Sequence, residues 1–173
     1  MKNRIIIGIF ILCLPFICYA ANNPDDNTYE TPARLFHIAR SVNKNLVCYD
    51  VNLQNGKINS KAPFKVYWVN REEHPGKTNG LSYIQRKLAY GYKVVSTSGN
   101  RCVCTLSAYP KRPLTLTHKT TGYVCLVKIN NETAVLQSLY VKAHPHNPLK
   151  VEYVELRGTS LTTHEPVTEK VKN

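Results

Sequence analysis

The chain has 173 residues, 43% of them hydrophobic, which suits one domain with a buried core and argues against several domains. It has no fixed-period repeat and no low-complexity tract, which excludes solenoid and fibrous classes. The net charge of +12 favours polyanionic partners, yet the basic residues form no run and no known nucleic-acid module, so we expect no nucleic acid partner.

The first 20 residues predict a cleavable signal peptide. Lys2 and Arg4 precede an apolar run over residues 5–17, and Cys18 and Ala20 place small residues where a signal peptidase reads. The run is shorter than the roughly 18–20 residues that cross a bilayer, although an uncleaved anchor stays an alternative. No later segment is long and apolar enough to be transmembrane. We therefore expect an exported protein, in the periplasm or at the cell surface.

Strands dominate the chain after a polar segment, residues 21–33, that we expect to be a disordered leader. Residues 35–40 alternate weakly between apolar and polar side chains, which is compatible with a first strand. Residues 46–53 and 64–69 are rich in β-forming side chains, which predicts two further strands. Between the second and the third, Asn55-Gly56 is the dipeptide that closes tight hairpins.

Residues 81–89 change from the two-residue period to a helical one. Leu81, Ile84 and Leu88 recur at three- and four-residue spacing, which predicts a short amphipathic helix with these side chains on its apolar face. We expect it to end near Gly91.

The two-residue period then returns, and Pro110–Pro113 looks like a turn. The further strands are expected at 92–97, 101–109, 114–118, 122–129, 133–141 and 149–156. Residues 159–173 are polar, and we expect a loose C-terminal tail. Strands at this spacing predict an all-β fold, an antiparallel β-sandwich or barrel of about eight or nine strands with one short inserted helix. It would form a single domain over residues 34–158.

Four cysteines follow the predicted signal peptide, namely Cys48, Cys102, Cys104 and Cys125. An even number permits disulfides in an oxidising compartment. Cys102 and Cys104 lie on one face of a predicted strand, and a bridge between them would be strained, so any disulfide should run to Cys48 or Cys125. Four free buried thiols are the alternative. One close pair without a second is not the spacing of a zinc site.

Several segments resemble a family of exported bacterial proteins catalogued only as a domain of unknown function. They are Cys48-Tyr49-Asp50, Val66-Tyr67-Trp68, residues 81–92 and Val151-Glu152-Tyr153-Val154, and the stretch Ile-Gln-Arg-Lys-Leu-Ala-Tyr-Gly-Tyr is the most specific. The resemblance covers about residues 34–158. It implies a small β-rich domain with a signal peptide, and it implies no activity, substrate or cofactor.

The helix and its flanks hold the densest set of functional groups: Tyr83, Gln85, Arg86, Lys87, Tyr90 and Tyr92. An arginine fork suits a carboxylate or phosphate, and tyrosine rings suit a sugar or a peptide. We interpret this set as a candidate ligand-binding edge. The alternative is a helix that covers one end of a barrel with solvated cations and packed rings.

Catalytic and metal-binding signals are weak. His144 and His146 could present both rings to one metal, but a histidine pair alone is not a site, so we expect no metal and no cofactor. The chain has no Gly-x-Ser-x-Gly elbow, and inward-facing cysteines would be inert.

The pattern favours a monomeric, non-catalytic binding module of the bacterial cell envelope. Its ligand could be an anionic glycan, a lipid or a partner protein. Two alternatives stay open. One is an envelope hydrolase with a His/acid or Cys/His site assembled in space, and the other is a structural or assembly subunit.

Overall fold

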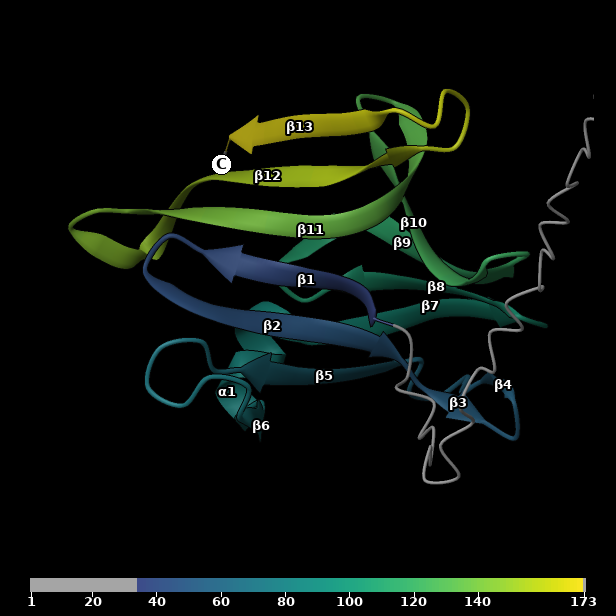
Figure 1. The fold of residues 1–173 in the computed structure, drawn as a ribbon, viewed down its shortest axis with the longest axis horizontal. Helices are drawn as coiled ribbons and strands as arrows, with labels where there is room; N and C mark the ends of the chain where they lie inside the picture. The colour runs from purple at the N-terminus through teal and green to yellow at the C-terminus, as the bar shows by residue number, and fades with distance from the viewer. Residues whose placement is uncertain (1–33, 173) are drawn as a thin grey trace, which may run out of the picture.

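The computed structural model describes residues 34–172, so the predicted signal peptide and leader lie outside the described residues. This part of the chain is mostly β-strand with one short helix, which confirms the predicted fold class (Figure 1). The strands are β1 Arg34–Arg40, β2 Asn43–Val51, β3 Leu53–Gln54, β4 Lys57–Ile58, β5 Phe64–Val69, β6 Thr78–Gly80, β7 Tyr92–Ser98, β8 Arg101–Leu106, β9 Tyr109–Lys119, β10 Gly122–Ile129, β11 Glu132–His144, β12 Asn147–Ser160 and β13 Pro166–Lys172.

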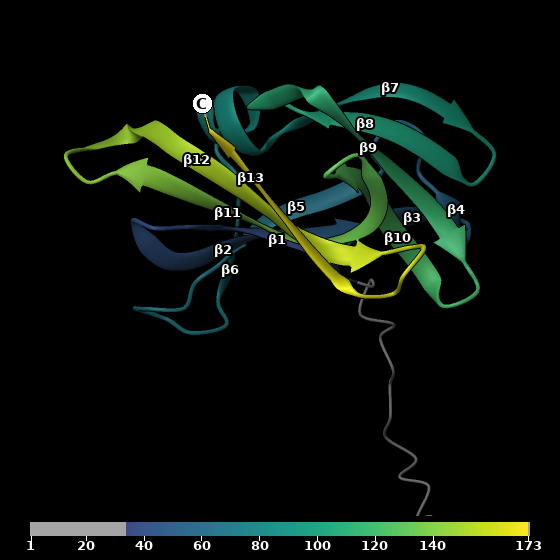
Figure 2. The same ribbon diagram turned by 90° about the horizontal axis from the view of Figure 1, so that it is seen from above.

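Strand β11 is the centre of the main sheet, because three strands pair with it. Its first half pairs with β10 and its second half with β1, while β12 runs along the other edge. The sheet order is β6-β5-β2-β1-β11-β10-β9-β8-β7, and β12 carries β13 outside it. We call β6-β5-β2-β1 the first wing and β10-β9-β8-β7 the second wing. The sheet curls so that the two wings face each other (Figure 2).

The sequence predicted an antiparallel arrangement, and all the main-sheet pairs except one are antiparallel. The exception is β1 with β11, whose register His37↔Ser138 to Arg40↔Val141 is parallel. Two-residue periodicity cannot reveal this, because it reports which face a side chain takes and not the direction of the neighbouring strand.

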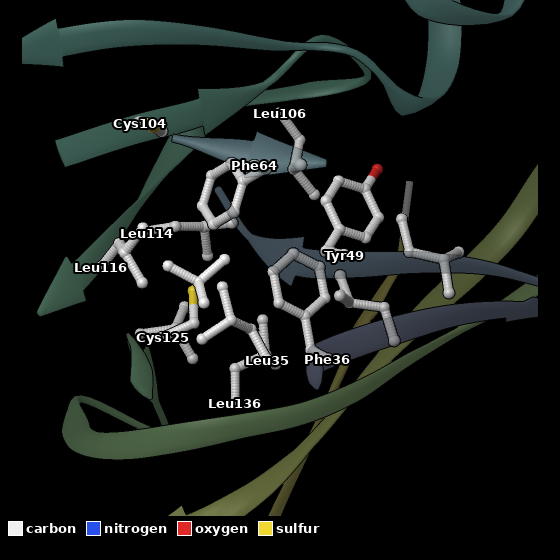
Figure 3. Packing of buried hydrophobic residues seen from close by; sticks show 14 of the residues in the cluster. Leu35, Phe36, Tyr49, Phe64, Cys104, Leu106, Leu114, Leu116, Cys125 and Leu136 are labelled. Atoms are coloured by element: carbon white, nitrogen blue, oxygen red, sulfur yellow. The ribbon is translucent and has the colours of Figure 1, made fainter. Parts of the chain in front are cut away.

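The core fills the space between the two wings. Phe36 and Tyr49 of the first wing stack with ring centroids 4.3 Å apart, and Phe64 meets both edge-on. Leu116 of the second wing and Leu136 of β11 close the core from the other side, and both are fully buried (Figure 3). Alternate residues of each strand therefore point inward, as expected for a sheet with one buried face.

The predicted loose tail is wrong over most of its length. Pro166–Lys172 forms β13, which pairs antiparallel with β12 from Tyr153↔Lys172 to Thr159↔Pro166. Val167 and Val171 pack against the core, and Arg112 of β9 holds Glu169 through two 2.7 Å bonds. An edge strand with two partly buried valines among polar residues has too weak an apolar pattern to be recognised from composition.

The predicted turn at Pro110–Pro113 is also wrong, since these residues belong to β9. The chain turns earlier, at Ser107 and Ala108, between β8 and β9. Both prolines can be accommodated because they lie in the first five residues of β9, beside the register shift between Thr105 and Leu106, where strand pairing is irregular.

The helix sits between β6 and β7 and has two parts. Tyr83–Gln85 is α-helical (α1), and Arg86–Tyr90 is a π-turn (η1). Ser82 caps the start with Gln85 in a reciprocal capping box. No helix within residues 34–172 has the length and apolar character that crossing a membrane requires.

The expectation that Leu81, Ile84 and Leu88 share one packed face holds only for Leu81, which is buried. Ile84 and Leu88 are 66% and 67% exposed. For Leu88 the π-turn is the cause, since a five-residue hydrogen-bonded turn rotates the side chains within it, so that Ala89 and Tyr90 pack inward instead. Ile84 precedes this turn and is exposed in α1.

Candidate functional site

The helix separates two hollows, and four of the six predicted site residues line one of them. Tyr83, Arg86, Lys87 and Tyr92 border a cleft of about 630 Å³ between the edges of the two wings. Its other lining residues are Lys61, Phe64, Val66, Leu81, Gly91 and Ser107. We call it the basic cleft, because three cations and no acidic side chain lie among its described lining residues.

Gln85 does not line this cleft. Its side-chain oxygen accepts from the Ser82 main-chain N–H at 2.9 Å and from Trp68 Nε1 at 3.3 Å. The Gln85 side chain therefore attaches the helix to β5. This is a structural role, which differs from the ligand contact that we expected for this residue.

Tyr90 faces the other hollow, a mostly apolar cavity of about 360 Å³. The cavity is lined by Ile38, Arg40, Leu88, Ala89, Tyr90, Leu106, Ala108, Tyr109, Leu139, Val141, Val151, Val154, Val171 and Lys172. Its side chains come from both wings, from the helix and from β12 and β13. We call it the apolar cavity.

Two cations reach the apolar cavity, and no acidic residue lies among its described lining residues. Arg40 Nη1 donates to the Tyr90 hydroxyl at 3.3 Å, and Lys172 ends β13 beside it. A guanidinium and a phenol at an apolar cavity are suited to a ligand with a hydrocarbon body and an anionic head.

Sequence reasoning missed Arg40. The signal was present, because Phe36, Ile38 and Arg40 alternate along β1 and the first two are buried. A cation on the apolar register of a strand indicates either a paired buried charge or a ligand contact.

The family comparison covers almost the whole described domain. Residues 36–170 match the family described as Domain of unknown function (DUF4833). The chain belongs to this family. The predicted resemblance to a family of unknown function is thereby confirmed, and the DUF4833 match extends past residue 158 into β13. No curated protein and no solved structure matches the chain.

A polar cluster lies on the outer face of the first wing of this DUF4833 domain. Asp50 is almost fully buried, and both of its oxygens are taken, one by Arg34 Nε and one by the Tyr67 hydroxyl. Arg34 also donates to Tyr67 at 2.8 Å and to Cys48 Sγ at 2.9 Å. The cluster is a closed network that ties β1, β2 and β5 together.

Cys48 of this cluster stands opposite His37 in the β1–β2 register. Burial raises the pKa of Cys48, and this outweighs the opposing effect of Arg34. Burial, together with Arg34 and Arg71, lowers the pKa of His37. A neutral, fully buried thiol is a poor nucleophile, so the pair does not make an activated Cys/His site.

The other three cysteines are buried free thiols in the core. Cys102 and Cys104 point to the same face, as predicted, with their sulfurs 3.6 Å apart. Burial raises the pKa of Cys104 and of Cys125.

The His144 and His146 rings lie 5.9 Å apart between β11 and β12. Within residues 34–172, no group of three or more His, Cys, Asp or Glu side chains is arranged to hold a metal ion.

Proposed function

We propose that this protein is a non-catalytic binding module of the bacterial cell envelope that holds an amphipathic anion, an apolar chain with a carboxylate or phosphate head. The observation that carries the proposal is the apolar cavity with Arg40 and Tyr90 on its wall. The exported location rests on the predicted signal peptide.

The size and lining of the cavity support a small ligand. A volume of about 360 Å³ falls within the roughly 300–1,000 Å³ of small-molecule sites. Valines and leucines from β11, β12 and β13 form much of the wall, and an apolar chain would gain by leaving water for this surface.

The polar groups support the anionic head. The planar guanidinium of Arg40 can bind both oxygens of a carboxylate or phosphate. Tyr90 could donate its hydroxyl proton to the same head, because Arg40 already donates to the Tyr90 oxygen.

Non-catalytic binding agrees with the chemistry of the described thiols. The four described cysteines are buried, and burial raises the pKa of Cys48, Cys104 and Cys125. These sulfurs therefore lack the exposed, anionic state that covalent catalysis requires.

The proposal is tested by calorimetric titration with two ligands of equal chain length. Dodecanoate carries a charged head, and dodecanol carries none. Arg40→Gln should weaken dodecanoate binding about tenfold, the effect of losing one charged hydrogen bond, and leave dodecanol binding unchanged. Val154→Trp, which fills the cavity, should abolish both.

Arg71→Gln is the matched control, since it removes an exposed arginine that does not line the cavity. Circular dichroism would verify that each variant folds. If folded wild-type protein binds neither ligand, or if Val154→Trp binds both normally, the cavity is not the binding site.

A further inference from the structure

Three large apolar side chains lie in solvent on the helix. Tyr83, Ile84 and Leu88 are 71%, 66% and 67% exposed, within six consecutive positions. Arg86 and Lys87 lie between them and are exposed too. We call these five residues the docking face. Single exposed apolar residues are ordinary, but a cluster on one short element marks an interaction surface.

The exposure of the docking face is fixed by the fold. The Gly91 N–H donates to the Arg86 carbonyl at 3.0 Å, and the Ser107 N–H donates to the Gly91 carbonyl at 2.8 Å. Ala89 and Tyr90 pack inward at the π-turn, the capping box of Ser82 with Gln85 holds the first turn, and Ile84 and Leu88 are left exposed. The helix therefore presents its apolar side chains outward in a defined geometry.

The charged residues that line the two hollows beside the docking face are all cations. Lys61, Arg86 and Lys87 line the basic cleft on one side of the helix, and Arg40 and Lys172 line the apolar cavity on the other. The sequence has no acidic residue between Glu73 and Glu132. Nine basic residues fall in that interval, namely Lys77, Arg86, Lys87, Lys93, Arg101, Lys111, Arg112, Lys119 and Lys128.

We infer that the docking face binds the surface of an anionic lipid bilayer. Exposed apolar side chains enter the boundary between headgroups and acyl chains, while lysine and arginine contact the anionic headgroups. Tyr83 suits the headgroup depth, because its ring is apolar and its hydroxyl polar. The complementary charge and the exposed apolar cluster favour a bilayer over a neutral protein partner.

Docking would also bring the apolar cavity to the membrane. Leu88 is a member of the docking face and lines the cavity. A lipid-derived amphipathic anion could then pass between the bilayer and the cavity beside Leu88. This link to the cavity rests on the proposed function, whereas the docking itself does not.

Flotation of the full mature chain with vesicles tests the inference. We compare vesicles of phosphatidylcholine alone with vesicles of phosphatidylcholine and phosphatidylglycerol at 7:3. Wild-type protein should float with the anionic vesicles and not with the neutral ones, and 0.5 M NaCl should reduce the bound fraction. Ile84→Ser with Leu88→Ser should lower the partition coefficient at least about tenfold.

Leu53→Ser is the matched control, because Leu53 is 37% exposed and lies on β3, at the far end of the sheet from the helix (Figure 1). It should float like wild-type protein. Arg86→Gln with Lys87→Gln should bind weakly and lose its salt dependence.

Three results would overturn the inference. The first is wild-type protein that does not float with the anionic vesicles. The second is an Ile84/Leu88 variant that floats like wild type. The third is a wild-type dimer in sedimentation that becomes a monomer in this variant, because a second copy would then cover the face. Dodecanoate binding is measured in a separate titration without vesicles. A failure of membrane docking can therefore be distinguished from a failure of ligand binding in the apolar cavity.

Discussion

The main-chain N–H of Gly91 donates to the carbonyl of Arg86, five residues earlier, at 3.0 Å. This bond closes the π-turn, in which Leu88 is exposed and Tyr90 is buried. π-turns of this kind are rare and are frequently found at functional sites. The same turn forms part of the wall of both hollows.

Gly91→Ala should destabilise the domain by about 1–3 kcal/mol. A Cβ at this position would lie 2.0 Å from the Arg86 carbonyl oxygen, and main-chain atoms cannot yield as a flexible side chain can. Urea denaturation measures the change. Gly80→Ala is the control, since a Cβ there has nothing within 4 Å, and it should leave the midpoint nearly unchanged. Equal midpoints for the two variants would contradict the close packing of the π-turn.

Tyr49→Phe should lower the free energy of unfolding by about 1–3 kcal/mol. The Tyr49 hydroxyl is fully buried and donates to the Tyr90 carbonyl at 2.6 Å, so its removal leaves a buried acceptor without this donor. Tyr123→Phe removes a hydroxyl that donates to the Gly56 carbonyl in an exposed place, where water can replace it. Differential scanning calorimetry of the two variants should therefore show a much larger loss for Tyr49.

Glu169→Gln should destabilise the protein at pH 7 and have little effect in acid. The Arg112 guanidinium, with help from the Asn130 N–H, lowers the pKa of Glu169 below its usual 4.5. A lowered folded-state pKa stabilises the protein above pH 4.5, and this stabilisation is lost as the pH falls through the folded-state value. We expect the wild-type and variant unfolding midpoints to converge as the pH falls below 4.5 and through the lower folded-state pKa of Glu169. A constant difference over this range would rule out a contribution from the Glu169 charge.

Native protein should react with a thiol reagent at none of Cys48, Cys102, Cys104 and Cys125, and at all four after unfolding in guanidinium without reductant. The reason is that each described sulfur is a buried free thiol. Mass spectrometry of the labelled peptides counts the reacted sites. If fewer than four cysteines are labelled after unfolding, the missing ones form the disulfides that an even number of cysteines permits.

The strands were largely predictable from local sequence. The expected strand at 64–69 coincides with β5, and the one at 122–129 coincides with β10. Asn55 and Gly56 both have positive φ, as the hairpin-closing dipeptide requires. The local alternation of apolar and polar side chains determines these strands, so a single sequence is sufficient to predict them.

The site was less predictable, because it depends on contacts between distant segments. Tyr83, Arg86, Lys87 and Tyr92 were expected to act together and do share the basic cleft. Arg40 meets Tyr90 across 50 residues, and no local pattern reports such a contact. The exposure of Leu88 depends on the π-turn, which a helical period of 3.6 cannot anticipate.

The parallel pairing of β1 with β11 bears on how the chain folds. It joins His37 to Ser138, about 100 residues apart, and such non-local pairings slow folding. The first wing cannot be joined to the second until nearly the whole chain is present. A protein that is exported, as we propose, would thus lack the junction between its two wings throughout most of its synthesis.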